Sequence, residues 1–116
     1  MASYEEFLGL EMRVGTVVRA EVFAEARNPA LKLWIDFGEY GVKQSSAQIT
    51  RYYAPQQLVG RQVVGVTNFP VKKVAGFPSQ VLVLGAMLPS GPAQAPGQEV
   101  VLLRPDREVP PGTRVL

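Results

Sequence analysis

The sequence predicts an all-β fold, a small five-stranded barrel with one short helix between its third and fourth strands. Residues 12–23 alternate apolar and polar side chains with a period of two, which is typical of a half-buried strand. Further short apolar segments follow, separated by turns that contain glycine or proline. The 116 residues, 47% of them hydrophobic, suit a single domain spanning residues 1–116 with one core.

A short helix is expected before the first strand. Ser3 and Glu6 have the spacing of a capping box, in which each side chain bonds the backbone of the other residue. The helix should run from about Tyr4 to Leu8 and end at Gly9.

The first strand, Met12 to Phe23, should present two different faces. One face is expected to hold Met12, Val14, Thr16, Val18, Ala20 and Val22, and the other Arg13, Val17, Arg19 and Glu21. Gly15 suits a bulge or bend where a small barrel curls.

The second strand should span Leu31 to Phe37, with Trp34 on the face opposite Leu33, Ile35 and Phe37. The connection from Gly38 to Gly41 has the length of a hairpin turn. The later elements expected are a polar strand at Val42–Gln48, one or two helical turns within Ile49–Gly60, strands at Gln62–Asn68 and Val81–Ala86, a surface loop at residues 89–97, and a pairing segment at Val100–Leu103. Three strands, a short helix and two strands follow the order of the Greek-key barrel called the OB-fold.

The positive charge is concentrated in the middle of the chain. Residues 27–81 carry seven cations against two acids, and no acidic side chain occurs between Glu39 and Glu99. The densest part of this window, residues 68–80, holds Lys72, Lys73 and two Phe-Pro pairs. Cations without nearby carboxylates produce a field that adds up, so this region is expected to attract polyanions or acidic protein segments.

The composition argues against an enzyme. The chain has no cysteine and no histidine, which removes thiolate metal sites, cysteine nucleophiles and the commonest general base. No glycine-rich phosphate loop is present. We therefore expect no catalytic residues, no bound metal and no cofactor.

Neither a signal peptide nor a membrane span is expected. Residues 1–7 lack a basic start followed by an apolar run, and the longest apolar stretch, Val81–Leu88, is far shorter than the roughly 20 residues that a span requires. These features predict a soluble cytoplasmic protein that does not insert into membranes.

The order of several short motifs resembles the tRNA-binding OB domain family. The motifs are Arg13-Val14-Gly15, Asn28-Pro29, Lys32-Leu33, Asp36-Phe37-Gly38, Tyr53 to Arg61, Val63-Val64, Asn68-Phe69-Pro70, Lys72 to Gly76, and Ser79 before an apolar strand. This family occurs as free-standing proteins and as an appendage of methionyl- and phenylalanyl-tRNA synthetases. The resemblance covers about residues 12–86 and implies the OB-fold and tRNA binding.

Within the family the chain is most similar to the CsaA secretion-chaperone branch. Residues 25–30, 35–38, 41–50 and 100–106 carry this similarity, together with the total length. The resemblance implies a homodimer that binds exported preproteins, with the export machinery as a further partner. It also implies a barrel core at residues 12–86 with dimerisation extensions at residues 1–11 and 87–116.

The chain departs from the wider tRNA-binding pattern at several positions. Asn28 stands where many members have histidine, Val81-Leu82 replaces a Gly-Met pair, and Phe69 replaces a leucine. These changes affect the region near Ser79, so tRNA recognition carries over less securely than the fold.

Two sets of candidate ligand-binding residues follow. The candidates for RNA contacts are Lys72, Lys73, Asn68, Gly76, Ser79, Arg51 and Lys43, as cations, hydrogen-bonding groups, or a glycine that permits close backbone approach. The candidates for peptide contacts are Phe69, Phe77, Ser45, Ser46 and Trp34. Solvated lysines, turn-forming polar residues and plain core packing are the alternatives, and Trp34 could instead belong to a dimer interface.

The two ends of the chain add apolar surface that a minimal barrel does not need. The candidate interface residues are Tyr4, Phe7, Leu8, Val100, Leu102 and Val115. Burial between two copies would remove this surface from water. The alternative is that the terminal segments close the ends of the barrel within one chain.

Three functions remain open from the sequence. The first is a homodimeric chaperone that holds unfolded or preprotein segments through apolar patches flanked by basic residues. The second is a structure-selective tRNA-binding protein that uses the same surface. Nonspecific single-strand binding is third, because few aromatic residues lie on the strands that would stack bases.

Overall fold

The computed structural model describes residues 1–89 and 99–116, and strands dominate it. The first half contains α1 (Tyr4–Leu8), β1 (Met12–Val22), β2 (Leu31–Asp36), a 3-10 turn (Gly38–Tyr40) and β3 (Val42–Ala47). The second half contains α2 (Pro55–Leu58), β4 (Gln62–Val66), β5 (Lys72–Val74), β6 (Phe77–Ser79), β7 (Leu82–Val83), β8 (Gly85–Met87) and β9 (Val100–Leu102). Almost all of the predicted loop at residues 89–97 lies outside the described residues.

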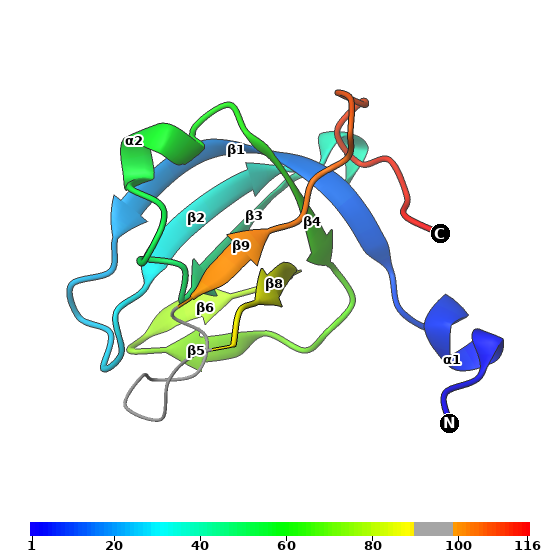
Figure 1. Ribbon diagram of the computed structural model, residues 1–116, viewed down its shortest axis with the longest axis horizontal. Coiled ribbons are helices and arrows are strands. Elements are labelled where there is room, and N and C mark those ends of the chain that lie inside the picture. Colours follow the sequence, from blue (N-terminus) through cyan, green and yellow to red (C-terminus); the bar gives the residue numbers. More distant parts are fainter. Residues whose placement is uncertain (90–98) are drawn as a thin grey trace.

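The main sheet is antiparallel and nearly closes into a barrel (Figure 1). Its strand order is β3-β2-β1-β4-β7, and β3 also lies close to β7, where the Ser45 hydroxyl donates to the Val81 carbonyl at 2.8 Å. The short helix α2 connects the third and fourth strands of this barrel. The predicted all-β OB-fold topology is therefore confirmed.

The predicted helix at the start of the chain is also confirmed, with its bounds and its caps. The Ser3 hydroxyl accepts from the Glu6 backbone N–H at 3.1 Å, and the Glu6 carboxylate accepts from the Ser3 N–H at 2.9 Å. This reciprocal pair satisfies two donors that a free helix end would leave without partners.

The first strand differs from the prediction in how its faces are arranged. A register irregularity lies between Val17 and Arg19, so the alternation changes phase there. Val17 is buried, whereas Val18 and Val22 are exposed. The expectation that Val18 and Val22 share a face with Met12 is therefore wrong, because an extra residue in one strand of a pair reverses every side chain beyond it.

Gly15 has a packing role near the predicted bend. A Cβ at this position would lie 2.5 Å from Ile35 Cγ2 and 2.8 Å from Phe37 Cε1, both in the barrel interior. Only glycine lets β1 pass this close to the core.

The barrel interior is filled by apolar side chains from all parts of the sheet. Leu33, Ile35, Phe37, Leu58 and Val63 are completely buried there. Their alternation along β2 confirms that Trp34 lies on the opposite face.

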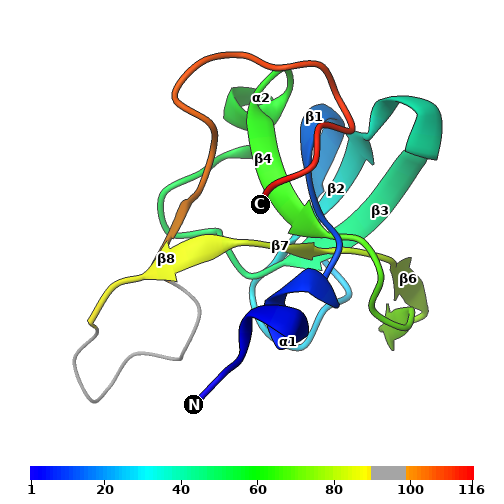
Figure 2. The same ribbon diagram turned by 90° about the vertical axis from the view of Figure 1, so that its right-hand side faces the viewer.

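A second, smaller apolar cluster lies outside the barrel and involves both ends of the chain. It contains Met12, Val14, Val64 and Val66, with Phe7, Leu10, Leu84, Val109 and Val115 packed against it. The C-terminal segment runs beside β1, where the Val14 N–H donates to the Thr113 carbonyl at 2.8 Å and the Val115 N–H donates to the Met12 carbonyl at 2.8 Å. Figure 2 shows the C-terminus beside β4 and α1 below the end of that strand.

The connection between β4 and β7 forms a hairpin that the sequence did not predict as strands. Strands β5 and β6 pair with Lys72 opposite Ser79 and Val74 opposite Phe77. The two turn residues, Ala75 and Gly76, have φ values of 46° and 81°, and positive φ at both central positions suits a tight hairpin turn.

The predicted strand Val81–Ala86 is divided in two. Leu82 and Val83 pair with β4, whereas Gly85 to Met87 leave the barrel and pair with β9. Figure 2 shows β8 extending outward from β7. Among the described residues, no helix has both the length and the apolar character needed to cross a membrane.

Candidate ligand-binding groove

An open groove of about 670 Å³ lies beside the β5–β6 hairpin. Its walls come from the loop after β1, the end of β3, the hairpin and the start of β7. We call it the hairpin groove, and it is lined by Ala26, Arg27, Asn28, Ala30, Ser46, Gln48, Phe69, Pro70, Lys72, Lys73, Val74, Ser79, Gln80, Val81 and Leu82. Segments distant in the sequence therefore meet at one surface.

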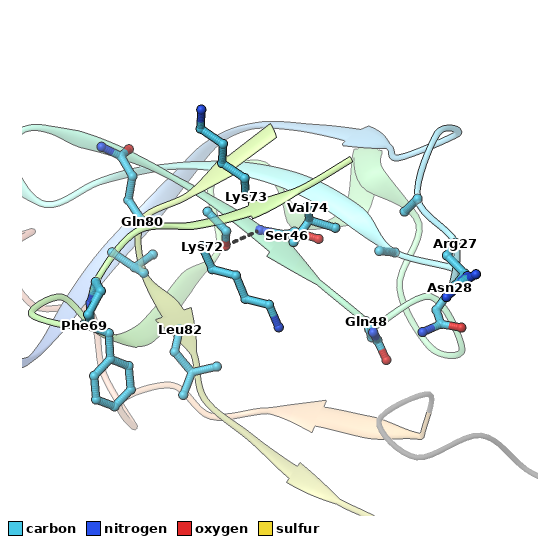
Figure 3. A pocket seen from close by; sticks show the side chains of 15 residues that line it. Arg27, Asn28, Ser46, Gln48, Phe69, Lys72, Lys73, Val74, Gln80 and Leu82 are labelled. Atoms are coloured by element: carbon cyan, nitrogen blue, oxygen red, sulfur yellow. Dashed lines mark hydrogen bonds between the residues drawn. The ribbon is translucent and has the colours of Figure 1, made fainter. Parts of the chain in front are cut away.

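The hairpin groove carries positive charge without any acidic neighbour in its lining. Its charged residues are Arg27, Lys72 and Lys73, and all three are exposed; of the two lysines, Lys72 extends across the groove, whereas the Lys73 side chain points the opposite way (Figure 3). Across residues 1–89 and 99–116 the two ion pairs are Arg19–Glu21 and Arg51–Glu99, neither of which involves these cations. Their charges are therefore available to a ligand.

The groove has an apolar end and a polar end. Phe69 and Leu82 lie together at one end, with 43% and 51% of their surfaces exposed (Figure 3). Arg27 and Asn28 lie at the other end, and the Lys72 side chain extends between the two. An extended ligand could thus place an apolar group and a negatively charged group a short distance apart.

Two side chains in the groove wall attach the hairpin to β3. The Ser79 hydroxyl accepts from the Ser46 N–H at 3.0 Å, and the Gln80 side-chain oxygen accepts from the Gln44 N–H at 2.9 Å (Figure 3 shows the first of these). These bonds occupy donors that an edge strand would otherwise offer to another chain. The Ser79 hydroxyl thus has a partner within the chain.

Two candidate polar residues use their side chains for hydrogen bonds within the chain. The Ser45 side chain is completely buried and donates to the Val81 carbonyl, so it offers no surface to a peptide. The Asn68 amide accepts from the Glu11 N–H at 2.9 Å and donates to the Gly9 carbonyl at 2.8 Å. Asn68 therefore links the segment after α1 to the end of β4, and it is not part of the groove lining.

The other candidate cations lie away from the hairpin groove. Arg51 Nε is 3.6 Å from a Glu99 carboxylate oxygen, so its charge is partly compensated. Lys43 is half-buried on β3 and does not line the groove.

The candidate aromatic residues Trp34 and Phe77 line a second cavity, of about 580 Å³, on the other side of the hairpin. We call this the outer cavity, and its lining comprises Arg19, Glu21, Phe23, Glu25, Lys32, Trp34, Gln44, Ala75, Gly76, Phe77 and Pro78. The Phe77 ring makes edge contacts with Phe23 and Trp34, at centroid distances of 5.4 and 5.7 Å. Phe77 therefore attaches the hairpin tip to the outer face of β1 and β2.

Cations in the outer cavity already have partners. The Arg19 guanidinium lies 4.4 Å from the Trp34 ring centroid and pairs with the Glu21 carboxylate. Lys32 Nζ lies 4.8 Å from the centre of Phe23 and 5.2 Å from that of Phe77. Such contacts satisfy a cation without a ligand.

Sequence reasoning gave the groove only in part. Lys72, Lys73, Ser79, Ser46 and Phe69 were candidates and all line the hairpin groove. Arg27 and Asn28 were not candidates, although the fold brings them to the same surface. The Asn28-Pro29 turn next to Arg27 was the available signal, since a polar turn within a conspicuous motif often lies at a binding site.

The candidate interface residues fall into two groups. Phe7, Val100 and Val115 pack against apolar clusters of their own chain, and Leu102 is 5% exposed within the main core. Tyr4 and Leu8 are exposed. The terminal segments thus pack against other parts of their own chain and also leave apolar side chains on the surface.

The described residues contain no cluster of three or more acidic, histidine or cysteine side chains that could hold a metal ion. The fold and the groove define a small OB-fold binding domain. Comparison with known proteins identifies the type of domain. Residues 12–114 match the family described as "Putative tRNA binding domain", and the chain belongs to this family.

Two solved structures resemble the chain over its whole length. The chaperone CsaA from Bacillus anthracis is 56% identical, with a TM-score of 0.87 and coverage of 100% of this chain and 99% of the other. The CsaA chaperone protein from Picrophilus torridus is 41% identical, with the same TM-score and full coverage of both chains.

The chain also resembles part of a longer enzyme. The methionine–tRNA ligase of Methanothrix thermoacetophila is 38% identical over 109 residues, which cover 94% of this chain but 15% of the ligase. The chain is thus homologous to a tRNA-binding domain that forms one part of such ligases.

Proposed function

We propose that the protein is a chaperone-type binding protein that holds unfolded polypeptide segments, including those of preproteins destined for export, in the hairpin groove. The observation that carries this proposal is the pair of exposed apolar side chains, Phe69 and Leu82, beside hydrogen-bonding and cationic groups in one open groove. Unfolded segments expose apolar side chains and backbone polar groups together, so both ends of the groove would be used. The 56% identity to a protein named as a chaperone supports this choice.

The test is a binding titration with a fluorescent unfolded peptide that contains an apolar core. Phe69→Ala combined with Leu82→Ser should weaken binding about tenfold, since removal of two apolar contacts costs roughly 1–2 kcal/mol. A matched control is Tyr52→Ala combined with Val59→Ser, because these residues are similarly exposed, at 45% and 52%, and lie outside the groove. Equal losses in both double variants would contradict the assignment.

Binding of tRNA in the same groove is the second candidate. It is favoured by the three cations and the absence of acidic side chains among the groove-lining residues. Membership of a tRNA-binding family supports it further. Each phosphate contact should contribute about 0.7–0.9 to the slope of log affinity against log salt. A flat salt dependence in a tRNA titration would contradict a role for Lys72 and Lys73 in phosphate binding.

A homodimer is the third part of the proposal. Tyr4, Leu8, Met87, Val101 and Leu103 remain exposed on the terminal segments and the β8–β9 hairpin. Burying such side chains between two copies would stabilise association by about 25 cal/mol per Å² of apolar surface. Light scattering should give twice the chain mass of 12.6 kDa, and a monomer would contradict this part.

A further inference from the structure

The side chains that line the hairpin groove carry a different balance of charge from those that line the outer cavity. The lining contributes Arg27, Lys72 and Lys73 and no carboxylate. Glu25, two residues before Arg27, lines the outer cavity instead. A ligand in the groove therefore meets positive charge that no acidic residue of the lining offsets.

These cations are also free of other partners within the described residues. They take part in neither of the ion pairs of the chain, and no aromatic ring lies beneath them. By contrast, Arg19 and Lys32 in the outer cavity each rest against an aromatic ring. The groove cations would gain their first close counter-charge from a ligand, and nearby opposite charges in a partly desolvated site attract more strongly than in water.

The wall of the groove excludes one common way to bind peptides. The Gln44 and Ser46 N–H groups at the edge of β3 already donate to the Gln80 and Ser79 side chains. A peptide could not add as a new strand to this part of β3 without breaking those bonds. On this part of β3, recognition therefore comes from side chains, so the charge of the ligand matters there.

We propose that the hairpin groove selects polypeptide segments in which apolar side chains lie next to aspartate or glutamate, and rejects segments with basic flanks. The apolar side chains would contact Phe69 and Leu82, while the carboxylates would approach Lys72 and Arg27. This inference rests on the proposed chaperone function and specifies which polypeptide segments the protein would bind. The basic start of a typical signal peptide would be repelled, so the groove would hold other parts of a preprotein.

The experiment compares three labelled peptides with the same apolar core, flanked by aspartate, serine or lysine residues. Binding of each to the purified full-length protein is measured by fluorescence anisotropy at low salt and at about 0.5 M salt, where screening shortens the range of surface charges to a few ångströms. The affinity should fall from the acidic to the neutral to the basic peptide, by about tenfold at each step at low salt, as expected for one or two close charge pairs. High salt should bring the three values together.

Charge-reversed variants test whether the hairpin groove is the source of this preference among the peptides. Lys72→Glu combined with Lys73→Glu should reverse the order, so that the basic peptide binds most tightly. Arg104→Glu combined with Arg107→Glu is the matched control, because it makes the same change in net charge at residues that line a different cavity. The control should keep the original order.

The possible results distinguish a failure of the proposed charge selection from a failure of the proposed chaperone function. If the basic peptide binds as well as the acidic one, the charge selection is wrong while the chaperone function stands. If none of the three peptides binds but tRNA does, the chaperone function is wrong and the groove serves RNA. If both charge-reversed variants change the order equally, the selection comes from net charge, and its assignment to the groove is wrong.

Discussion

Both sides of the β5–β6 hairpin carry cationic and aromatic residues, but those on the outer side contact one another, whereas those on the groove side are exposed. On the outer side, Arg19 and Lys32 rest against aromatic rings, and Arg19 also pairs with Glu21. On the groove side, Lys72 and Arg27 are exposed, and neither takes part in an ion pair or an aromatic contact recorded for the described residues. The first arrangement stabilises the fold, and the second leaves charge for a ligand. Counting cations and aromatic residues in the sequence would not separate the two.

The same contrast applies to the aromatic residues. Phe77 contacts Phe23 and Trp34 and holds the hairpin against the outer face, whereas Phe69 is exposed at the end of the groove. Both precede a proline, and both were candidates for peptide contacts on equal grounds. Their surroundings place one in packing contacts and leave the other exposed.

The largest expected effect concerns stability. Phe77→Ala should lower the free energy of unfolding by about 2 kcal/mol, because it removes a partly buried ring and two aromatic contacts. Urea denaturation measures the change. Phe69→Ala is the matched control and should cost less than about 0.5 kcal/mol, as is usual for surface positions. Similar losses in the free energy of unfolding for both variants would contradict the claim that Phe77 stabilises the fold more than Phe69 does.

A second prediction concerns tRNA affinity. Lys72→Ala combined with Lys73→Ala should weaken binding about tenfold, or ~1.4 kcal/mol, and should reduce the slope of the salt dependence. The matched variant, Arg19→Ala combined with Lys32→Ala, removes the same charge from the outer cavity and should change affinity by less than about twofold. Anisotropy titrations with labelled tRNA would give both values, and equal losses would show that the two cavities contribute alike.

A third prediction concerns the attachment of the hairpin to β3. Ser79→Ala should lower stability by about 1 kcal/mol, because the Ser46 N–H loses its acceptor. Ser46→Ala is a useful control, since its backbone N–H would remain bonded to the Ser79 hydroxyl, and it should cost clearly less. If Ser46→Ala proved the more damaging change, the bond would not be what holds the hairpin.

The smallest expected effect is that of Arg19→Ala. The Arg19–Glu21 pair is solvent-exposed, with side-chain exposures of 62% and 41%. Exposed ion pairs contribute about 0–1 kcal/mol to stability, and exposed cation–π contacts about 0.5–1 kcal/mol. Thermal or urea denaturation should therefore show a loss of about 0.5–1 kcal/mol, and a loss above that of Phe77→Ala would reverse the proposed order.

Much of the fold could be predicted because periodicity reports burial directly. The alternation in residues 31–37 correctly separated Trp34 from its buried neighbours. The same reasoning failed along β1, because the irregularity lies between Val17 and Arg19, beyond Gly15, where a bulge or bend was expected. The β5–β6 hairpin was missed because its strands have three residues each, and one of them contains Pro78.

The groove was only half predictable for a related reason. Lys72, Lys73 and Ser79 are close in sequence, so their shared surface could be inferred from the acid-free window. Arg27 and Gln48 reach the same groove only through the pairing of β1, β2 and β3. Long-range pairing of this kind depends on register, which local patterns specify weakly.

The central claim is that one groove holds its ligands through its apolar and cationic ends together. A competition titration tests this claim most directly. Labelled tRNA bound to the purified protein would be titrated with the acidic-flanked apolar peptide at two salt concentrations. The account predicts complete displacement, with the peptide concentration needed rising in proportion to the tRNA present. A peptide that binds the tRNA complex without displacing tRNA would contradict it.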